Sequence, residues 1–245
     1  MTELEVLNGR SVARRQALPP VLAGVALGVA AFSVDLAPEV VGRFLVPAFS
    51  SEFAWGVVAL AVSYFAATFR SALVAGVGTL VLATLIYYGL VVSLSRRWYH
   101  GSSSSGPEEV VSLDGLTSVA RASAFWLVGA LIGGLVLGCL ASVVRVGSAR
   151  NAGVALGVAF GLLTGEAAYA IFHALFIWVG PVDSFVCARI GSAAVQFLLA
   201  VVAALVALRL RRRLVALWVL LMAAAVSVTA NVAIWHLIEL VRTTL

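Results

Sequence analysis

Seven long apolar runs, separated by short polar segments, limit what this chain can fold into. They cover residues 18–34, 53–69, 72–94, 123–144, 152–179, 190–208 and 214–237. About 20 apolar residues cross the hydrocarbon core of a bilayer as a helix, and a helix satisfies its own backbone hydrogen bonds where water is absent. The runs therefore predict an all-α fold, a polytopic transmembrane helix bundle with about seven spans.

The composition argues against a soluble protein. Hydrophobic residues make up 62% of the 245 residues and charged residues 11%, whereas soluble domains carry about 25% charged residues. We expect lipid to surround the chain, in a bacterial plasma membrane that it crosses several times. Residues 1–17 are predicted to be a cytoplasmic tail and residues 18–245 a single transmembrane domain, with an extracytoplasmic loop at 95–122.

The arginines predict the orientation, because cytoplasmic loops of membrane proteins are enriched in basic residues. With the N-terminus in the cytoplasm, the inner side has two acids, Glu3 and Glu5, and most of the arginines. These inner arginines are Arg10, Arg14, Arg15, Arg70, Arg145, Arg150, Arg209, Arg211, Arg212 and Arg213. The arginines are scattered or stand at span ends rather than among aromatic residues on one face, so no nucleic-acid partner is expected.

Residues 152–179 carry a glycine at every fourth position, namely Gly153, Gly157, Gly161 and Gly165. From one glycine to the next, the position around the helix axis shifts by only about 40°, so the four glycines form one row. Small residues let a neighbouring helix approach closely within lipid. We expect this glycine zipper to pack a helix of the bundle, a second copy of the chain or another membrane protein.

The heptapeptide Gly-Val-Ala-Leu-Gly-Val-Ala occurs twice, at residues 24–30 and 153–159. Both copies begin a span that runs from inside to outside in the predicted topology. One interpretation is a pair of parallel three-span repeats joined by the fourth span, as in some transporters. The alternative is coincidence in a chain rich in Ala, Val, Leu and Gly, because the match does not extend further.

A stripe of polar residues occupies another face of the same span. Glu166, Tyr169 and His173 lie within about 60° of one another around the helix axis. Glu166 and His173 are about 10 Å apart along that axis, so Tyr169 or water would have to join them. An ionisable residue within a membrane points to a proton or solute path, or to a hydrogen bond between helices. With glycines on one face and this stripe on another, the span is predicted to be central.

A second polar group ends the seventh run, where His236 and Glu239 share one helix face. A pair with this spacing can supply two metal ligands, but no complete metal motif such as His-Glu-x-x-His accompanies it. A solvated helix end is the simpler interpretation. Nucleotide-binding glycine loops and the Gly-x-Ser-x-Gly motif of hydrolases are also missing from the sequence. We therefore expect no metal, no cofactor and no assigned catalytic residue.

Several short features resemble a family of actinobacterial integral membrane proteins of unknown function. They are Arg70–Ser71, Tyr87–Tyr88, Phe125–Trp126, Gly133–Gly134 and Gly165–Glu166, and the similarity covers residues 53–179. The resemblance implies a bacterial plasma membrane and a helix bundle, and it transfers no activity or site.

Three functional hypotheses follow from the sequence. The first is a non-enzymatic accessory subunit or permease-like bundle involved in transport. The second is a membrane-embedded enzyme in which Glu166, Tyr169 and His173 act as acid–base groups. The third is a structural assembly partner that uses the glycine face.

Overall fold

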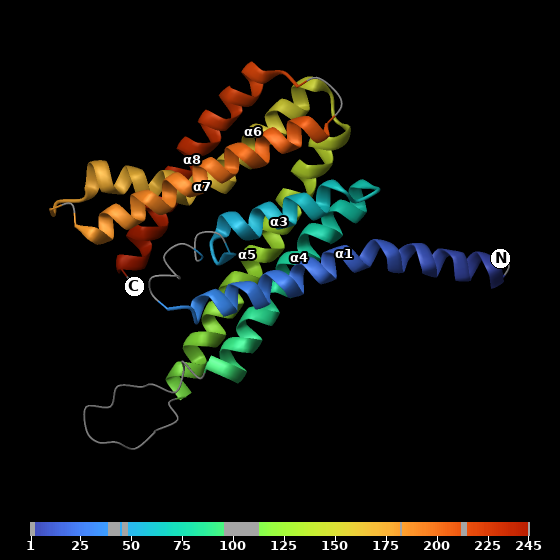
Figure 1. Ribbon diagram of the computed structural model, residues 1–245, viewed down its shortest axis with the longest axis horizontal. Helices are drawn as coiled ribbons and strands as arrows, with labels where there is room; N and C mark the ends of the chain where they lie inside the picture. The colour runs from blue at the N-terminus through green and yellow to red at the C-terminus, as the bar shows by residue number, and fades with distance from the viewer. Residues whose placement is uncertain are drawn as a thin grey trace.

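The computed structural model describes residues 3–38, 45, 49–95, 113–181, 183–211 and 215–244, which fold into a helical bundle (Figure 1). Its α-helices are α1 (Glu3–Asp35), α3 (Glu52–Tyr64), α4 (Phe69–Leu90), α5 (Leu113–Val146), α6 (Ala149–Phe172), α7 (Ser184–Leu210) and α8 (Leu217–Thr244). Two π-helical turns, η1 (Val91–Ser95) and η3 (His173–Ile177), extend α4 and α6. Six of these helices are long and apolar enough to cross a membrane. The predicted all-α transmembrane bundle is thus confirmed.

The second predicted span differs from the expectation. Residues 53–69 were expected to form one span, but α3 ends at Tyr64 and a new helix starts at Phe69. The 13 residues of α3 measure about 20 Å, less than the roughly 30 Å of a hydrocarbon core. The next helix starts at a capping box, because Thr68 and Ser71 each accept a backbone N–H of the other through their hydroxyl oxygens. In the described part of the chain, six long helices and one short helix therefore take the place of seven similar spans.

Two other boundaries also differ. The first helix begins at Glu3, so residues 3–17, predicted as a tail, continue the helix of the first span. Helix α5 begins at Leu113, so the final part of the predicted loop at 95–122 belongs to a helix. The serine-rich part of that loop, residues 96–112, lies outside the described residues.

Three links between helices meet at one end of the molecule, which we call the arginine end. Arg145, near the end of α5, donates to the backbone carbonyls of Ala66 and Ala67 in the link between α3 and α4. Arg211, which follows α7, donates to the carbonyl of Gly147 at 2.6 Å. These guanidinium groups bind carbonyls at and beyond helix ends, where backbone acceptors lack helical partners. They thereby fix how α3, α5 and α7 end.

The two copies of the heptapeptide occupy equivalent places in the fold. A Cβ atom added at Gly28 would lie 2.6 Å from the carbonyl oxygen of Ala83, so α1 lies directly against α4. A Cβ at Gly157 would lie 2.5 Å from the carbonyl oxygen of Leu220, so α6 lies against α8 in the same way. In each half, the first helix of three packs on the third through its glycines. This is the arrangement that a pair of parallel repeats would have.

The remaining glycines of the α6 row also face α8. A Cβ at Gly161 would be 2.4 Å from the Cβ of Ser227, and one at Gly165 would be 2.6 Å from the Cβ of Asn231. The row thus lies within the chain, against a neighbouring helix. Of the six long helices, α6 has the largest buried share of its most apolar window, 61%, which agrees with its predicted central place.

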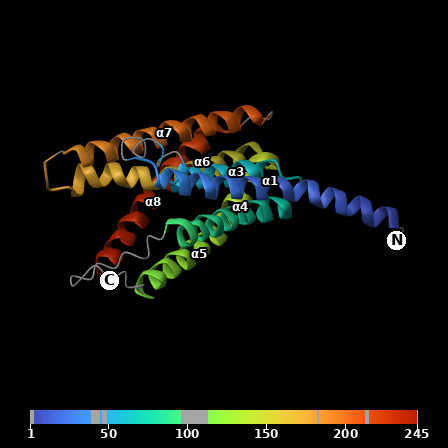
Figure 2. The same ribbon diagram turned by 60° about the horizontal axis from the view of Figure 1, so that its bottom comes forward.

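The short helix α3 is enclosed by the longer helices. It contacts α4 and α5 on one side and α6 on another, with further contacts to α1 and α7. Figure 2 shows α3 between α6 and the α4–α5 pair. The sides of α3 are therefore covered by other helices, while Glu52 in its first turn is exposed.

Candidate functional site: a cavity at the start of α3

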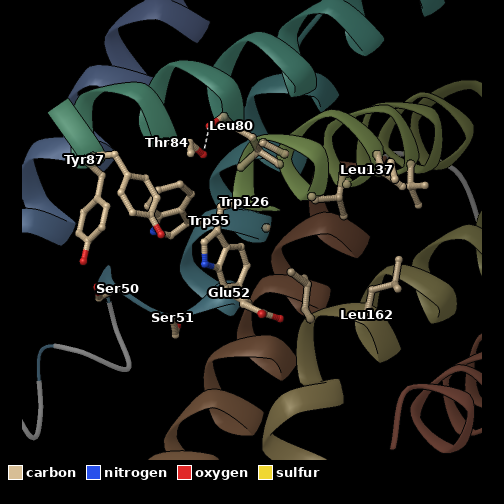
Figure 3. A pocket seen from close by; sticks show the side chains of 18 residues that line it. Ser50, Ser51, Glu52, Trp55, Leu80, Thr84, Tyr87, Trp126, Leu137 and Leu162 are labelled. Atoms are coloured by element: carbon tan, nitrogen blue, oxygen red, sulfur yellow. Dashed lines mark hydrogen bonds between the residues drawn. The ribbon is translucent and has the colours of Figure 1, made fainter. Parts of the chain in front are cut away.

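A cavity of about 560 Å³ lies where α3, α4, α5 and α6 meet (Figure 3). Pockets that bind small molecules commonly have volumes of roughly 300–1,000 Å³ and mostly apolar walls with a few polar groups. The walls here are largely leucine, valine and isoleucine side chains together with the backbone of glycines. Four aromatic residues, which we call the aromatic lining, complete them: Trp55, Tyr87, Tyr88 and Trp126.

Polar groups enter the cavity where the chain turns into α3. Ser51 is the N-cap residue, and its hydroxyl oxygen accepts the backbone N–H of Ala54 at 3.3 Å. Such a bond satisfies a backbone donor that has no partner inside the helix. The hydroxyl of Ser50 donates to the carboxylate of Asp35 at 3.1 Å, and the hydroxyl of Tyr87 donates to the same carboxylate at 2.5 Å. The end of α1 therefore holds both the start of α3 and one wall of the cavity.

The rings of the aromatic lining support one another. Trp55 and Tyr87 meet edge to face, with centroids 6.3 Å apart, and Tyr87 and Tyr88 do so at 5.1 Å. This geometry matches the positive edge of one ring to the negative face of the next. The buried indole Nε1 of Trp55 has no hydrogen-bond partner among the described residues, so one donor at this wall is unused.

A series of charged groups connects the cavity with α6 and α7. Among the described residues that line the cavity, Glu52 alone carries a charge, and its side chain is exposed. Glu52 interacts electrostatically with the half-buried Glu166 on α6, and Glu166 interacts with Arg189 on α7. From the sequence alone we singled out Glu166 but neither Glu52 nor Arg189.

The two polar groups predicted from the sequence lie together in the structure. Tyr169 is 3% exposed, and its ring centroid lies 6.0 Å from that of His173 and 6.3 Å from that of His236. Tyr169 also interacts electrostatically with Glu239 and Arg189. The stripe on α6 and the group on α8 therefore form one polar cluster, which includes Arg189 from α7.

Three hydroxyl groups on α4 and α8 have backbone carbonyls as their partners. The hydroxyl of Thr84 donates to the carbonyl of Leu80 at 2.8 Å, and that of Thr79 donates to the carbonyl of Pro20 at 3.4 Å. Ser227 packs against the glycine row and donates to a backbone carbonyl of α6. The Thr84 bond lies within α4, while the bonds of Thr79 and Ser227 join neighbouring helices.

The described part of the chain has no group of three or more His, Cys, Asp or Glu side chains placed to hold a metal ion. Cys139 and Cys187 are both free thiols. The chemistry available at the cavity is therefore that of a carboxylate, hydroxyl groups and aromatic rings.

The fold and the cavity define a class, the multi-pass α-helical membrane protein. Comparison of the chain with protein-family models, with curated proteins and with solved structures gave no match.

Proposed function

We propose that this protein is a multi-pass plasma-membrane protein of the permease-like type, with its N-terminus in the cytoplasm, that binds a small solute in the cavity at the start of α3. The observation that carries the proposal is the short helix itself. It begins beside the cavity and next to Asp35 at the end of the first span, and it is too short to cross the hydrocarbon core by itself.

Interrupted helices of this kind are a recognised feature of transporters. Many secondary transporters bind their solutes where a discontinuous helix begins near the bilayer midplane, between repeated units. An irregular backbone at that depth is tolerated where it is buried in protein or lines a cavity. The Asp35 contacts of Ser50 and Tyr87 support this interpretation, because they anchor the turn into α3 to the cavity wall.

The other hypotheses have less support. An enzyme that uses the stripe would need a substrate to reach Glu166, Tyr169 and His173. These residues are not among the described residues that line the cavity, and Tyr169 is buried. An assembly partner that uses the glycine face would need that face to be free, but α8 covers it. The actinobacterial resemblance remains a proposal about the origin of the chain.

Access of water to the cavity tests the proposal. A Cβ at Gly133 would make only ordinary contact, 3.8 Å from the Cδ1 of Leu80, so cysteine fits there. Gly78 on α4 provides the matched control, because a Cβ at that position meets nothing within 4 Å and the residue is exposed on the outside of the bundle. Both variants are made in a chain whose native thiols are removed by Cys139→Ala and Cys187→Ala.

The two variants are treated in membrane vesicles with a charged, membrane-impermeant methanethiosulfonate. We expect Gly133→Cys to react at least tenfold faster than Gly78→Cys, because only the first thiol would meet water. Equal rates would mean that the cavity is closed to water, and the permease-like function would then be rejected.

A further inference from the structure

The walls of the cavity indicate the chemical class of its solute. We propose that the cavity takes a lipophilic organic cation, held by the carboxylate of Glu52 and by the aromatic lining. This inference rests on the proposed function, because it requires a solute to enter the cavity. The inference extends the proposed function by stating that the solute is positively charged and otherwise apolar.

The sign of the charge follows from the groups in and around the cavity. Glu52 is the one charged side chain among the described lining residues, and Glu166 adds a second carboxyl group nearby. Asp35 lies behind the wall, at the hydroxyl of Tyr87. Among the described residues in this neighbourhood, the basic group is Arg189, which interacts with Glu166 and with Tyr169. Acidic groups thus outnumber basic ones in the described surroundings of the cavity.

The N-terminus of α3 weakens the negative electrostatic potential of the cavity without reversing its sign. The N-terminus of a helix carries the equivalent of roughly +0.5 charge, which by itself would favour an anion. Glu52 stands in the first turn of α3, and its carboxylate, when ionised, exceeds the helix contribution. A cation beside this helix start favours that ionised form, because an opposite charge nearby stabilises the carboxylate.

The aromatic lining selects an organic cation over a hydrated metal ion. The faces of tryptophan and tyrosine rings attract cations, and this attraction is strongest when the cation has lost its water. The rest of the wall is apolar, including Leu80, Leu137 and Leu162. Apolar walls stabilise a solute with hydrocarbon groups, whereas one carboxylate and a few hydroxyls do not replace the octahedral oxygen shell that a small ion such as Mg²⁺ requires. A cation surrounded by alkyl or aryl groups satisfies both requirements.

Two ions of the same shape and opposite charge test the inference. Tetraphenylphosphonium and tetraphenylborate both carry four phenyl rings on a central atom, and differ in charge. Equilibrium dialysis of each ion against the full-length protein in detergent measures saturable binding. We expect the cation to bind at least tenfold more tightly than the anion.

Variants then locate the site. We expect Glu52→Gln to weaken cation binding at least tenfold and to leave anion binding unchanged or stronger. The control is Asp183→Asn, which removes an exposed carboxylate but retains a good N-cap residue for α7. Trp126→Leu should weaken cation binding, and Trp218→Leu, at an exposed position on α8, should not.

The outcomes separate the two proposals. Equal binding of the two ions, unaffected by Glu52→Gln, would overturn the cation inference and leave the solute-binding function in place. If neither ion binds saturably while the Gly133→Cys thiol reacts rapidly with the water-soluble reagent, the cation inference also fails and the water-accessible cavity remains. Failure of both assays would remove the proposed function itself. The comparison of the two ions on the wild-type protein needs no variant, so a misfolded variant does not decide the result.

Discussion

Substitution at Gly157 tests the packing of α6 on α8. In the structure a Cβ at this position would lie 2.5 Å from the carbonyl oxygen of Leu220 and 2.8 Å from the Cβ of Ala223. Ordinary van der Waals contact begins at about 3.4 Å, so Gly157→Ala requires the two helix backbones to separate by about 0.9 Å locally. A separation of this size disturbs the whole seam, because backbone atoms cannot rotate away as a flexible side chain can.

The expected magnitude comes from two opposing effects. Overpacking a tight contact costs about 1–3 kcal/mol of unfolding free energy, while alanine is favoured over glycine within a helix by about 1 kcal/mol. Gly78→Ala gains the helix preference of alanine without any overpacking, because nothing lies within 4 Å of its added Cβ. The unfolding free energy of Gly157→Ala should therefore be about 1–3 kcal/mol below that of Gly78→Ala.

The measurement is reversible unfolding in mixed micelles as the fraction of sodium dodecyl sulfate increases, followed by far-ultraviolet circular dichroism. Comparing two alanine variants cancels the general effect of replacing a glycine. If Gly157→Ala is as stable as Gly78→Ala, or more stable, the backbones of α6 and α8 are not in contact at this point. The close seam described above would then be wrong.

Three further predictions concern single contacts, and each is measured by the same unfolding assay. Arg145→Ala should lower the unfolding free energy by about 2 kcal/mol, because it removes hydrogen bonds from a charged donor. Its control, Arg150→Ala at an exposed position, should change that free energy by less than about 0.5 kcal/mol, and equal effects of the two variants would contradict the role of the arginine end. Thr68→Ala should cost about 1 kcal/mol through loss of the α4 cap, and no loss would mean that the capping box is dispensable. Tyr87→Phe should cost about 1.5–3 kcal/mol, because it removes a hydrogen bond to the carboxylate of Asp35, and an unchanged stability would refute that anchor.

The sequence predicted the class of fold because hydrophobicity and length directly determine which segments can cross lipid. The prediction of a single span over residues 53–69 was wrong for the same reason. Residues 65–67, which separate α3 from α4, are Phe, Ala and Ala, and an apolar link cannot be distinguished from a helix by hydropathy. The available signal was local, because Thr68 and Ser71 form a cap that marks a new helix start.

The site was less predictable than the fold, since four helices contribute to it. Helical periodicity grouped Glu166, Tyr169 and His173 on one face, and the rings of Tyr169 and His173 do lie together, but periodicity contains no information about which other helix faces them. The contact of Tyr169 with His236 therefore appeared only in the structure. Glu52 was missed because its importance depends on the early start of a short helix beside a cavity.

The close contacts of α1 with α4 and of α6 with α8 have a mechanical consequence. Two helices whose main chains touch along a row of glycines cannot slide or separate without breaking many contacts at once, so each pair must move as a single rigid unit. The cavity has one wall on α4 and another on α6, and hence one wall on each unit. A small rotation between the two units would widen or narrow the cavity while leaving both pairs intact.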